Sequence, residues 1–90
     1  MTLALHLNMA AAALKESELH VAVSACNEAL KLDARNVKAL YRRAQAYAAL
    51  VRWDEADEDL RFALEIEPNN KGVREEIQVG SWHLYLLLVF

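Results

Sequence analysis

The fold of this chain is set by residues 37–70, which run VKALYRRAQAYAALVRWDEADEDLRFALEIEPNN. The stretch holds two runs rich in Ala, Leu, Arg and Glu, residue types that favour helix. Residues 3–36 have the same organisation, because sliding the sequence by 34 residues brings six identical pairs into register. These pairs are Ala10/Ala44, Ala12/Ala46, Ala22/Ala56, Ala29/Ala63, Leu30/Leu64 and Asn36/Asn70. The chain therefore contains an internal repeat.

Each 34-residue unit is predicted to form two helices. The expected ranges are 3–15, 19–32, 37–50 and 54–67, with a further helix over 71–79. Asn36 and Asn70 precede predicted helices and are N-cap candidates, whereas Pro68 cannot continue the helix that ends at Glu67. No cluster of β-branched residues is long enough to suggest a strand. The sequence predicts an all-α fold.

Composition excludes several classes of function. Ninety residues allow one small domain, and a net charge of −3 with a pI near 5.5 provides no positive field for nucleic acid. The single Cys26 cannot form an internal disulfide, which favours a cytoplasmic or nuclear location. Its position in the repeat predicts a buried small side chain. We expect no metal and no cofactor, since the histidines are scattered: His6, His20 and His83.

The second unit carries small residues, aromatic residues and a proline at characteristic spacing: Ala44, Tyr47, Trp53, Ala56, Leu60, Ala63 and Pro68. With its 34-residue period, this pattern resembles the tetratricopeptide repeat (TPR). The first unit fits at Ala10, Ala22, Cys26 and Ala29, but has Ala13 and Ala34 where the family has an aromatic residue and a proline. Val51 stands in the inter-helix turn, where the family often has Gly.

The resemblance implies a solenoid of helix-turn-helix repeats. Two repeats would occupy residues 3–36 and 37–70, followed by a capping helix at 71–79 and an apolar tail at 80–90. Tyr47 and Trp53 would then be packing residues. The concave groove of such a solenoid is lined by the first helix of each repeat, so we expect a binding site on the helices of residues 3–15 and 37–50.

Lys38 and Arg42 are four residues apart on the second of these helices and project from one face. Asn8 occupies the position equivalent to Arg42 in the first repeat. The strings LNMA around Asn8 and NVKALYRRAQAY around Lys38 and Arg42 resemble the carboxylate clamp of co-chaperone TPR domains, above all FKBP-type immunophilins. The resemblance implies that Asn8, Lys38 and Arg42 bind a peptide carboxylate. Tyr41 and Gln45 are further candidates for peptide contact.

Clamps of this family use five residues, and these three are the ones that carry over to this chain. The charge pattern favours an acidic ligand, because the groove helix has Lys38, Arg42 and Arg43 and no acid. The direction of Arg43 stays open, since its repeat position often points toward the neighbouring helix. The helix predicted at 54–67 is expected to face its acids outward: Asp54, Glu55, Asp57, Glu58, Asp59, Glu65 and Glu67. Ordinary solvated helix surface is the alternative explanation of the cations.

The expected function is a co-chaperone-type module that binds the acidic C-terminal tail of a heat shock chaperone. A generic TPR scaffold, and an inactive fragment of an FKBP-type peptidyl-prolyl isomerase, are the alternatives. We expect no catalysis, since nothing in the chain resembles the β-rich isomerase domain. We do not expect nucleic acid or a membrane as a partner. Self-association through the exposed edge of a repeat is a further expectation.

The tail at residues 82–90, WHLYLLLVF, is almost wholly apolar. Its nine residues fall short of the roughly 20 needed to span a bilayer. Three interpretations stay open. The tail folds back onto the last repeat, attaches to a membrane interface, or results from truncation or alternative splicing.

Overall fold

The computed structural model describes residues 1–69. Asn70, the predicted capping helix at 71–79 and the apolar tail at 80–90 lie outside the described residues. Four helices follow one another in the described part, which contains no strand: α1 (Leu3–Lys15), α2 (Leu19–Leu32), α3 (Val37–Ala49) and α4 (Trp53–Ile66). The fold is all-α, as predicted. The first two helices have the predicted bounds, whereas α3 ends and α4 begins one residue early.

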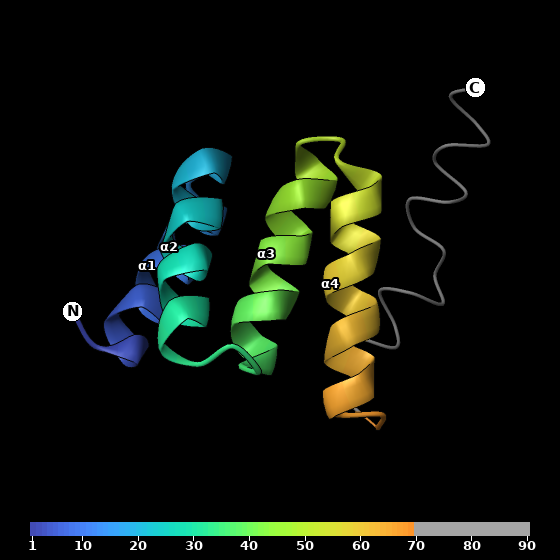
Figure 1. Cartoon of the computed structure of the whole chain (residues 1–90). Coiled ribbons are helices and arrows are strands. Elements are labelled where there is room, and N and C mark those ends of the chain that lie inside the picture. The colour runs from blue at the N-terminus through green and yellow to red at the C-terminus, as the bar shows by residue number, and fades with distance from the viewer. Residues whose placement is uncertain (70–90) are drawn as a thin grey trace.

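The helices form two antiparallel hairpins that stack side by side, α1 with α2 and α3 with α4 (Figure 1). The hairpins meet mainly through α2 and α3, and α1 also touches α3. Within residues 1–69, no helix has the length and apolar character that crossing a membrane requires. Antiparallel pairing places the beginning of α3 and the end of α4 at the same end of the second hairpin (Figure 1).

Side chains cap the first helix of each hairpin. The hydroxyl of Thr2 accepts a hydrogen bond from the Leu5 N–H at 3.3 Å. The Asn36 amide oxygen accepts one from the Ala39 N–H at 2.9 Å, as predicted for this N-cap. These bonds satisfy main-chain donors that the first turn of a helix leaves without an internal partner.

Each hairpin turns through a residue in the left-handed conformation. These residues are Ser17, with φ of 58°, and Val51, with φ of 63°, and they are 34 positions apart. After Val51 the N–H of Arg52 donates to the carbonyl of Tyr47 at 2.8 Å, and Val51 itself donates to Ala48 at 3.0 Å. This bond pair is the Schellman motif, which ends α3 at Ala49. A β-branched residue is strained in this conformation.

The core is built mainly from alanine. Ten alanines are buried among residues 1–69, together with Leu40, Cys26 and Leu60 as the largest fully enclosed side chains. Leu40 and Leu60 join three alanines in one cluster, and the partly buried Tyr47 and Trp53 pack against it, as expected for packing residues. Small side chains let the helices approach closely, but they bury little apolar surface.

A buried ion pair crosses this core. Asp59 is 5% exposed, and the Arg43 guanidinium donates to both of its carboxylate oxygens, at 2.8 Å from Nε and 2.6 Å from Nη2. A third bond runs from Arg43 Nη1 to the Asn27 side-chain oxygen at 2.9 Å. Arg43 therefore joins α3 to α4 and α2. Hydrogen bonding to Asp59 raises the pKa of Arg43 above its ordinary value.

This pair corrects one expectation and decides another. Asp59 was expected to face outward with the other acids of the last helix, but it is buried in the fold. Arg43, whose direction the sequence left open, points toward the neighbouring helix. Asp59 follows Ala56 by three residues and precedes Ala63 by four, so it lies on the packed face of α4.

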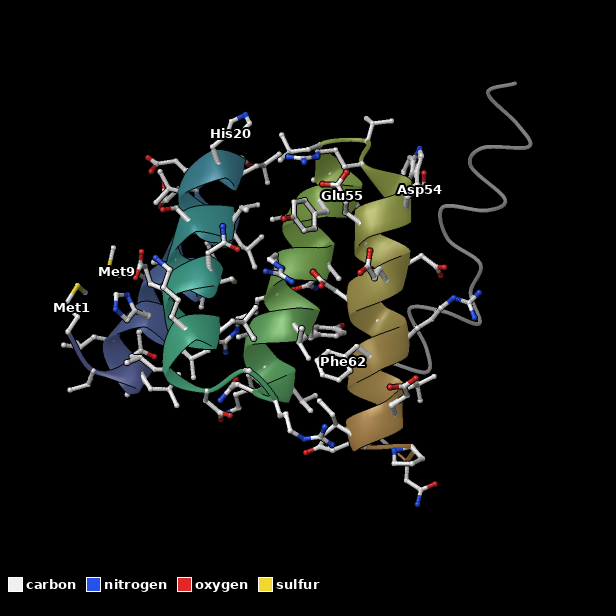
Figure 2. All side chains as sticks on the ribbon, in the orientation of Figure 1. Met1, Met9, His20, Asp54, Glu55 and Phe62 are labelled. Atoms are coloured by element: carbon white, nitrogen blue, oxygen red, sulfur yellow. The ribbon has the colours of Figure 1, made fainter. Side chains whose placement is uncertain are left out.

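The outer side of α1 forms the other end of the stack. Met1 and Met9 project there, on the far side of the molecule from α4 (Figure 2), and they are 71% and 42% exposed. Leu5 lies between them on the same face and is 49% exposed. Self-association through an exposed repeat edge stays a prediction.

The left-handed turn generates a first prediction. Replacing Val51 by Gly should stabilise the protein by about 1 kcal/mol, because Gly adopts positive φ without steric cost. Little packing is lost, since Val51 is 64% exposed. Thermal unfolding should show a midpoint raised by roughly 4–8 °C. Ser17→Gly is the matched control and should gain less, because Ser is not β-branched. A lower midpoint for Val51→Gly would contradict this account.

The buried pair generates a second prediction. Asp59→Asn keeps the shape but removes the charge opposite Arg43, and should cost about 3 kcal/mol of unfolding free energy. The lower end of the usual range applies because the Arg43 side chain is 23% exposed and water can reach it. Urea denaturation followed by circular dichroism measures the loss. Asp57→Asn, which weakens the ion pair with the exposed Arg61, is the control and should change stability little. Equal losses in the two variants would rule out a special role for Asp59.

Candidate functional site

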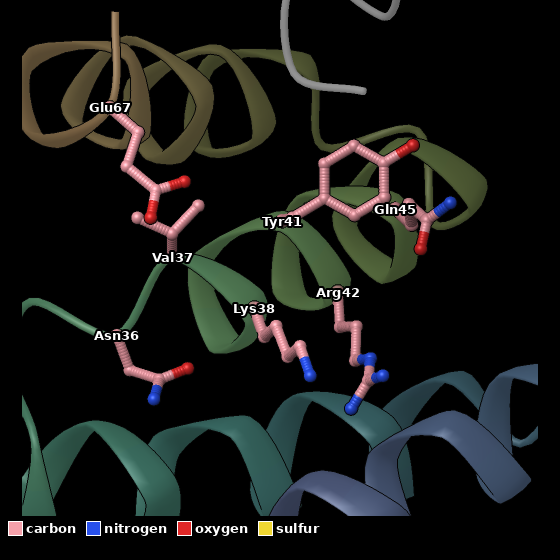
Figure 3. Close-up of a pocket in the computed structure, with 7 residues that line it drawn as sticks. All are labelled: Asn36, Val37, Lys38, Tyr41, Arg42, Gln45 and Glu67. Atoms are coloured by element: carbon pink, nitrogen blue, oxygen red, sulfur yellow. The ribbon is translucent and has the colours of Figure 1, made fainter. Parts of the chain in front are cut away.

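A hollow of about 420 Å³ opens beside the first turns of α3 (Figure 3). Residues of α3, its N-cap and the end of α4 line it: Asn36, Val37, Lys38, Tyr41, Arg42, Gln45 and Glu67. Four of the five residues predicted to form the site thus share one hollow. They are brought together because positions 38, 41, 42 and 45 fall on one side of a helix with 3.6 residues per turn.

Lys38 and Arg42 point the same way in Figure 3, toward the first hairpin. Lys38 is exposed and Arg42 is half-buried. Arg42 Nη1 donates a hydrogen bond to the carbonyl oxygen of Leu7 in α1, at 2.8 Å. A guanidinium has five N–H donors in a rigid plane, so this bond fixes its position and leaves donors that can bind an anion.

The other three predicted residues lie as follows. Tyr41 and Gln45 line the hollow beside the two cations. Asn8 is exposed on α1 and does not line it. Arg42 instead meets α1 at the main-chain carbonyl of Leu7, the residue before Asn8. The carbonyl of Leu7 is a site element that no side-chain pattern could have revealed.

Glu67 is the acid that the sequence interpretation placed incorrectly. It was expected to face outward with the other acids of the last helix, but it lines the hollow opposite the cations (Figure 3). The cause is antiparallel pairing, which brings the C-cap of α4 to the beginning of α3. The predicted hairpin was the available signal. Two antiparallel helices bring the last residue of the second helix, Glu67, close to the first residues of the first helix, Val37 and Lys38.

The electrostatics of the α3 wall favour an anion. The helix carries Lys38 and Arg42 toward the hollow and has no acidic residue along its length. Its N-terminus also contributes the positive end of a helix dipole. A carboxylate entering this hollow from solvent would meet two cations and no α3 carboxylate.

The remaining reactive groups of residues 1–69 include one cysteine and two histidines. Cys26 is fully buried and free, as predicted for a small packing residue. Burial raises the pKa of its thiol to about 11, which disfavours the nucleophilic thiolate. Among residues 1–69, no three His, Cys, Asp or Glu side chains are arranged to hold a metal ion.

Two stacked helical hairpins with a charged hollow on one wall define a helical-repeat interaction module. Residues 37–70 match the model of the tetratricopeptide repeat. The TPR domain of Arabidopsis OM64 is 36% identical, with a TM-score of 0.85, over 91% of this chain and 68% of that one. The first TPR domain of Spaghetti (RPAP3), bound to the HSP90 peptide SRMEEVD, is 36% identical, with a TM-score of 0.85, over 93% and 67%. The chain belongs to the tetratricopeptide repeat family.

Peptidyl-prolyl cis-trans isomerase FKBP4 of Homo sapiens is 39% identical over 77 residues. The match covers 86% of this chain but 17% of the isomerase, and it is confined to the TPR region of that protein. The resemblance to FKBP-type immunophilins is thereby confirmed for the repeats. A TPR domain is a non-catalytic interaction module, and that is what this chain is.

The burial of Cys26 generates a third prediction. Its pKa is about 11 when folded, against 9.0 for an unperturbed thiol, so the folded state keeps a proton that the unfolded state loses. The contribution of this buried thiol to the free energy of unfolding is therefore fully present below pH 9. It decreases by about 2 kcal/mol as the pH rises from 9 through 11. Urea denaturation from pH 8 to 11 should show this extra loss in the natural chain relative to Cys26→Ala. A difference between the two proteins that is independent of pH would contradict it.

Proposed function

We propose that this chain is a co-chaperone-type module that holds the acidic C-terminal tail of a heat shock chaperone in the hollow beside α3. One observation carries the proposal: Lys38 and Arg42 point the same way into a hollow that Tyr41 and Gln45 also line. The likeness to a TPR domain bound to an HSP90 peptide supports it, because that peptide ends in Glu-Glu-Val-Asp.

The chemistry of the two cations fits such a ligand. A C-terminal Asp presents its side-chain carboxylate and the terminal carboxylate close together. The Lys38 ammonium is a mobile point charge, whereas the Arg42 guanidinium is fixed by Leu7 and can bind one carboxylate through two parallel bonds. Each charge-assisted bond contributes about 1.5–3 kcal/mol, and the exposed Lys38 contributes less because water screens it.

The proposal gives each residue a role that its placement supports. Arg42 is the primary carboxylate ligand, Lys38 neutralises the second carboxylate, and Tyr41 and Gln45 contact the peptide beyond its terminus. Asn8 stays a prediction from the resemblance, since it is exposed outside the hollow. This arrangement needs a free C-terminus, which distinguishes it from a generic scaffold that binds an internal segment.

The experiment compares the peptide SRMEEVD with its C-terminally amidated form by isothermal titration calorimetry. We expect amidation and Arg42→Ala each to weaken binding about tenfold, because each removes one charge-assisted contact, and Lys38→Ala to weaken it less, because water screens the exposed ammonium. Lys31→Ala, an exposed lysine of α2 outside the hollow, is the matched control and should bind normally. Circular dichroism verifies that Arg42→Ala, which also loses its bond to Leu7, stays folded. Equal affinity for the two peptide forms would disprove the proposal.

A further inference from the structure

The hollow beside α3 has two walls of opposite charge. Lys38 and Arg42 lie on the α3 wall that faces the first hairpin, and the Glu67 carboxylate lies across the hollow at the end of α4 (Figure 3). The α3 N-terminus and the α4 C-terminus add partial charges of the same two signs. A ligand that matches this hollow carries an anion at one place and a cation at another.

The main-chain position of Glu67 is fixed by the fold. Its N–H donates to the Ala63 carbonyl at 2.8 Å, which makes it the C-cap of α4. Pro68 follows and cannot extend the helix. The main chain of Glu67 therefore stays at the edge of the hollow, and its side chain lines the hollow from there.

We propose that Glu67 makes the hollow selective for tails of mixed charge, in which a basic side chain precedes the terminal acidic residues. Lys38 and Arg42 hold the terminal carboxylates, and Glu67 pairs with the base upstream. The inference rests on the proposed function and names the kind of tail that this site prefers. A tail with acids alone leaves Glu67 facing like charge, which disfavours it.

The order of charges along the ligand follows from the order of groups around the hollow. A peptide whose terminal carboxylates meet Arg42 and Lys38 continues out of a hollow that Glu67 also lines, from the end of α4 near Val37. Each extended residue advances the peptide by about 3.3–3.6 Å, so a long basic side chain a few residues upstream comes within reach. The HSP90 peptide SRMEEVD in the similar TPR domain has this order, with Arg before Glu-Glu-Val-Asp.

The test is a double-mutant cycle between protein and peptide. Four peptides are titrated into the natural chain and Glu67→Gln: SRMEEVD, its variant with Arg replaced by Ala, and two variants with Arg moved one and two residues toward the terminus. We expect at least one Arg-containing peptide to bind the natural chain about two- to fivefold more tightly than the Ala variant, the range of an exposed ion pair. Glu67→Gln should remove that preference.

Two controls establish that the effect arises from Glu67 and from charge. Glu65→Gln changes an exposed acid of α4 that does not line the hollow, and should keep the preference of the natural chain. High salt should abolish the preference in the natural chain, because screening weakens exposed ion pairs. A preference that is equal in the natural chain and Glu67→Gln for every peptide would overturn the inference.

Failure of this inference is distinguishable from failure of the proposed function. If the amidated peptide binds as well as the free acid, the carboxylate site itself is wrong. If the free carboxylate is required but no Arg position couples to Glu67, the carboxylate site holds and the selectivity proposal alone is overturned.

Discussion

The arrangement of the helices depends on the hydrogen bonds that the Arg43 guanidinium donates. It binds both oxygens of the buried Asp59 and the side-chain oxygen of Asn27, and so joins α3 to α4 and to α2. A core made mainly of alanine offers few large side chains to interlock, and it therefore specifies the angles and register of neighbouring helices weakly. Bidentate hydrogen bonds are directional and specify what the alanines do not. The same guanidinium lies over the aromatic ring of Tyr47, with Arg43 Cζ 5.7 Å from the centroid of the ring.

This use of Arg43 explains why the binding surface lies where it does. Adjacent residues of a helix point about 100° apart, so Arg42 and Arg43 cannot serve the same face. Arg43 is directed into the stack, and Arg42 is thereby directed to the hollow with Lys38. One helix supports the fold with one side and offers cations with the other. The bond from Arg42 to the Leu7 carbonyl makes the first hairpin a support for the second.

Much of this could be predicted from residues alone. The 34-residue period gave the hairpins, Asn36 marked the start of α3, and the repeat position of Cys26 indicated its burial. The predictions that were wrong share a cause. Each concerned a contact between residues that are far apart in the sequence. Asp59 was interpreted as surface charge and the direction of Arg43 stayed open, since only the packed structure shows that they face each other. Glu67 was assigned to the outer face with the other acids of its helix, but the antiparallel pairing of α3 and α4 brings it beside the start of α3.

The two repeats have the same backbone plan but different charges at the equivalent place. Positions 4 and 8 of α1 correspond to Lys38 and Arg42, yet they hold Ala and Asn, which carry no charge. Asp33 corresponds to Glu67, but its carboxylate accepts hydrogen bonds from the Arg35 N–H at 3.2 Å and the Asn36 amide at 3.3 Å. The acid of the first repeat thus orders the loop into α3, whereas the acid of the second lines the hollow. The place on the first hairpin that corresponds to the hollow therefore lacks the two cations, and the first hairpin contributes the Leu7 carbonyl that positions Arg42 on the second.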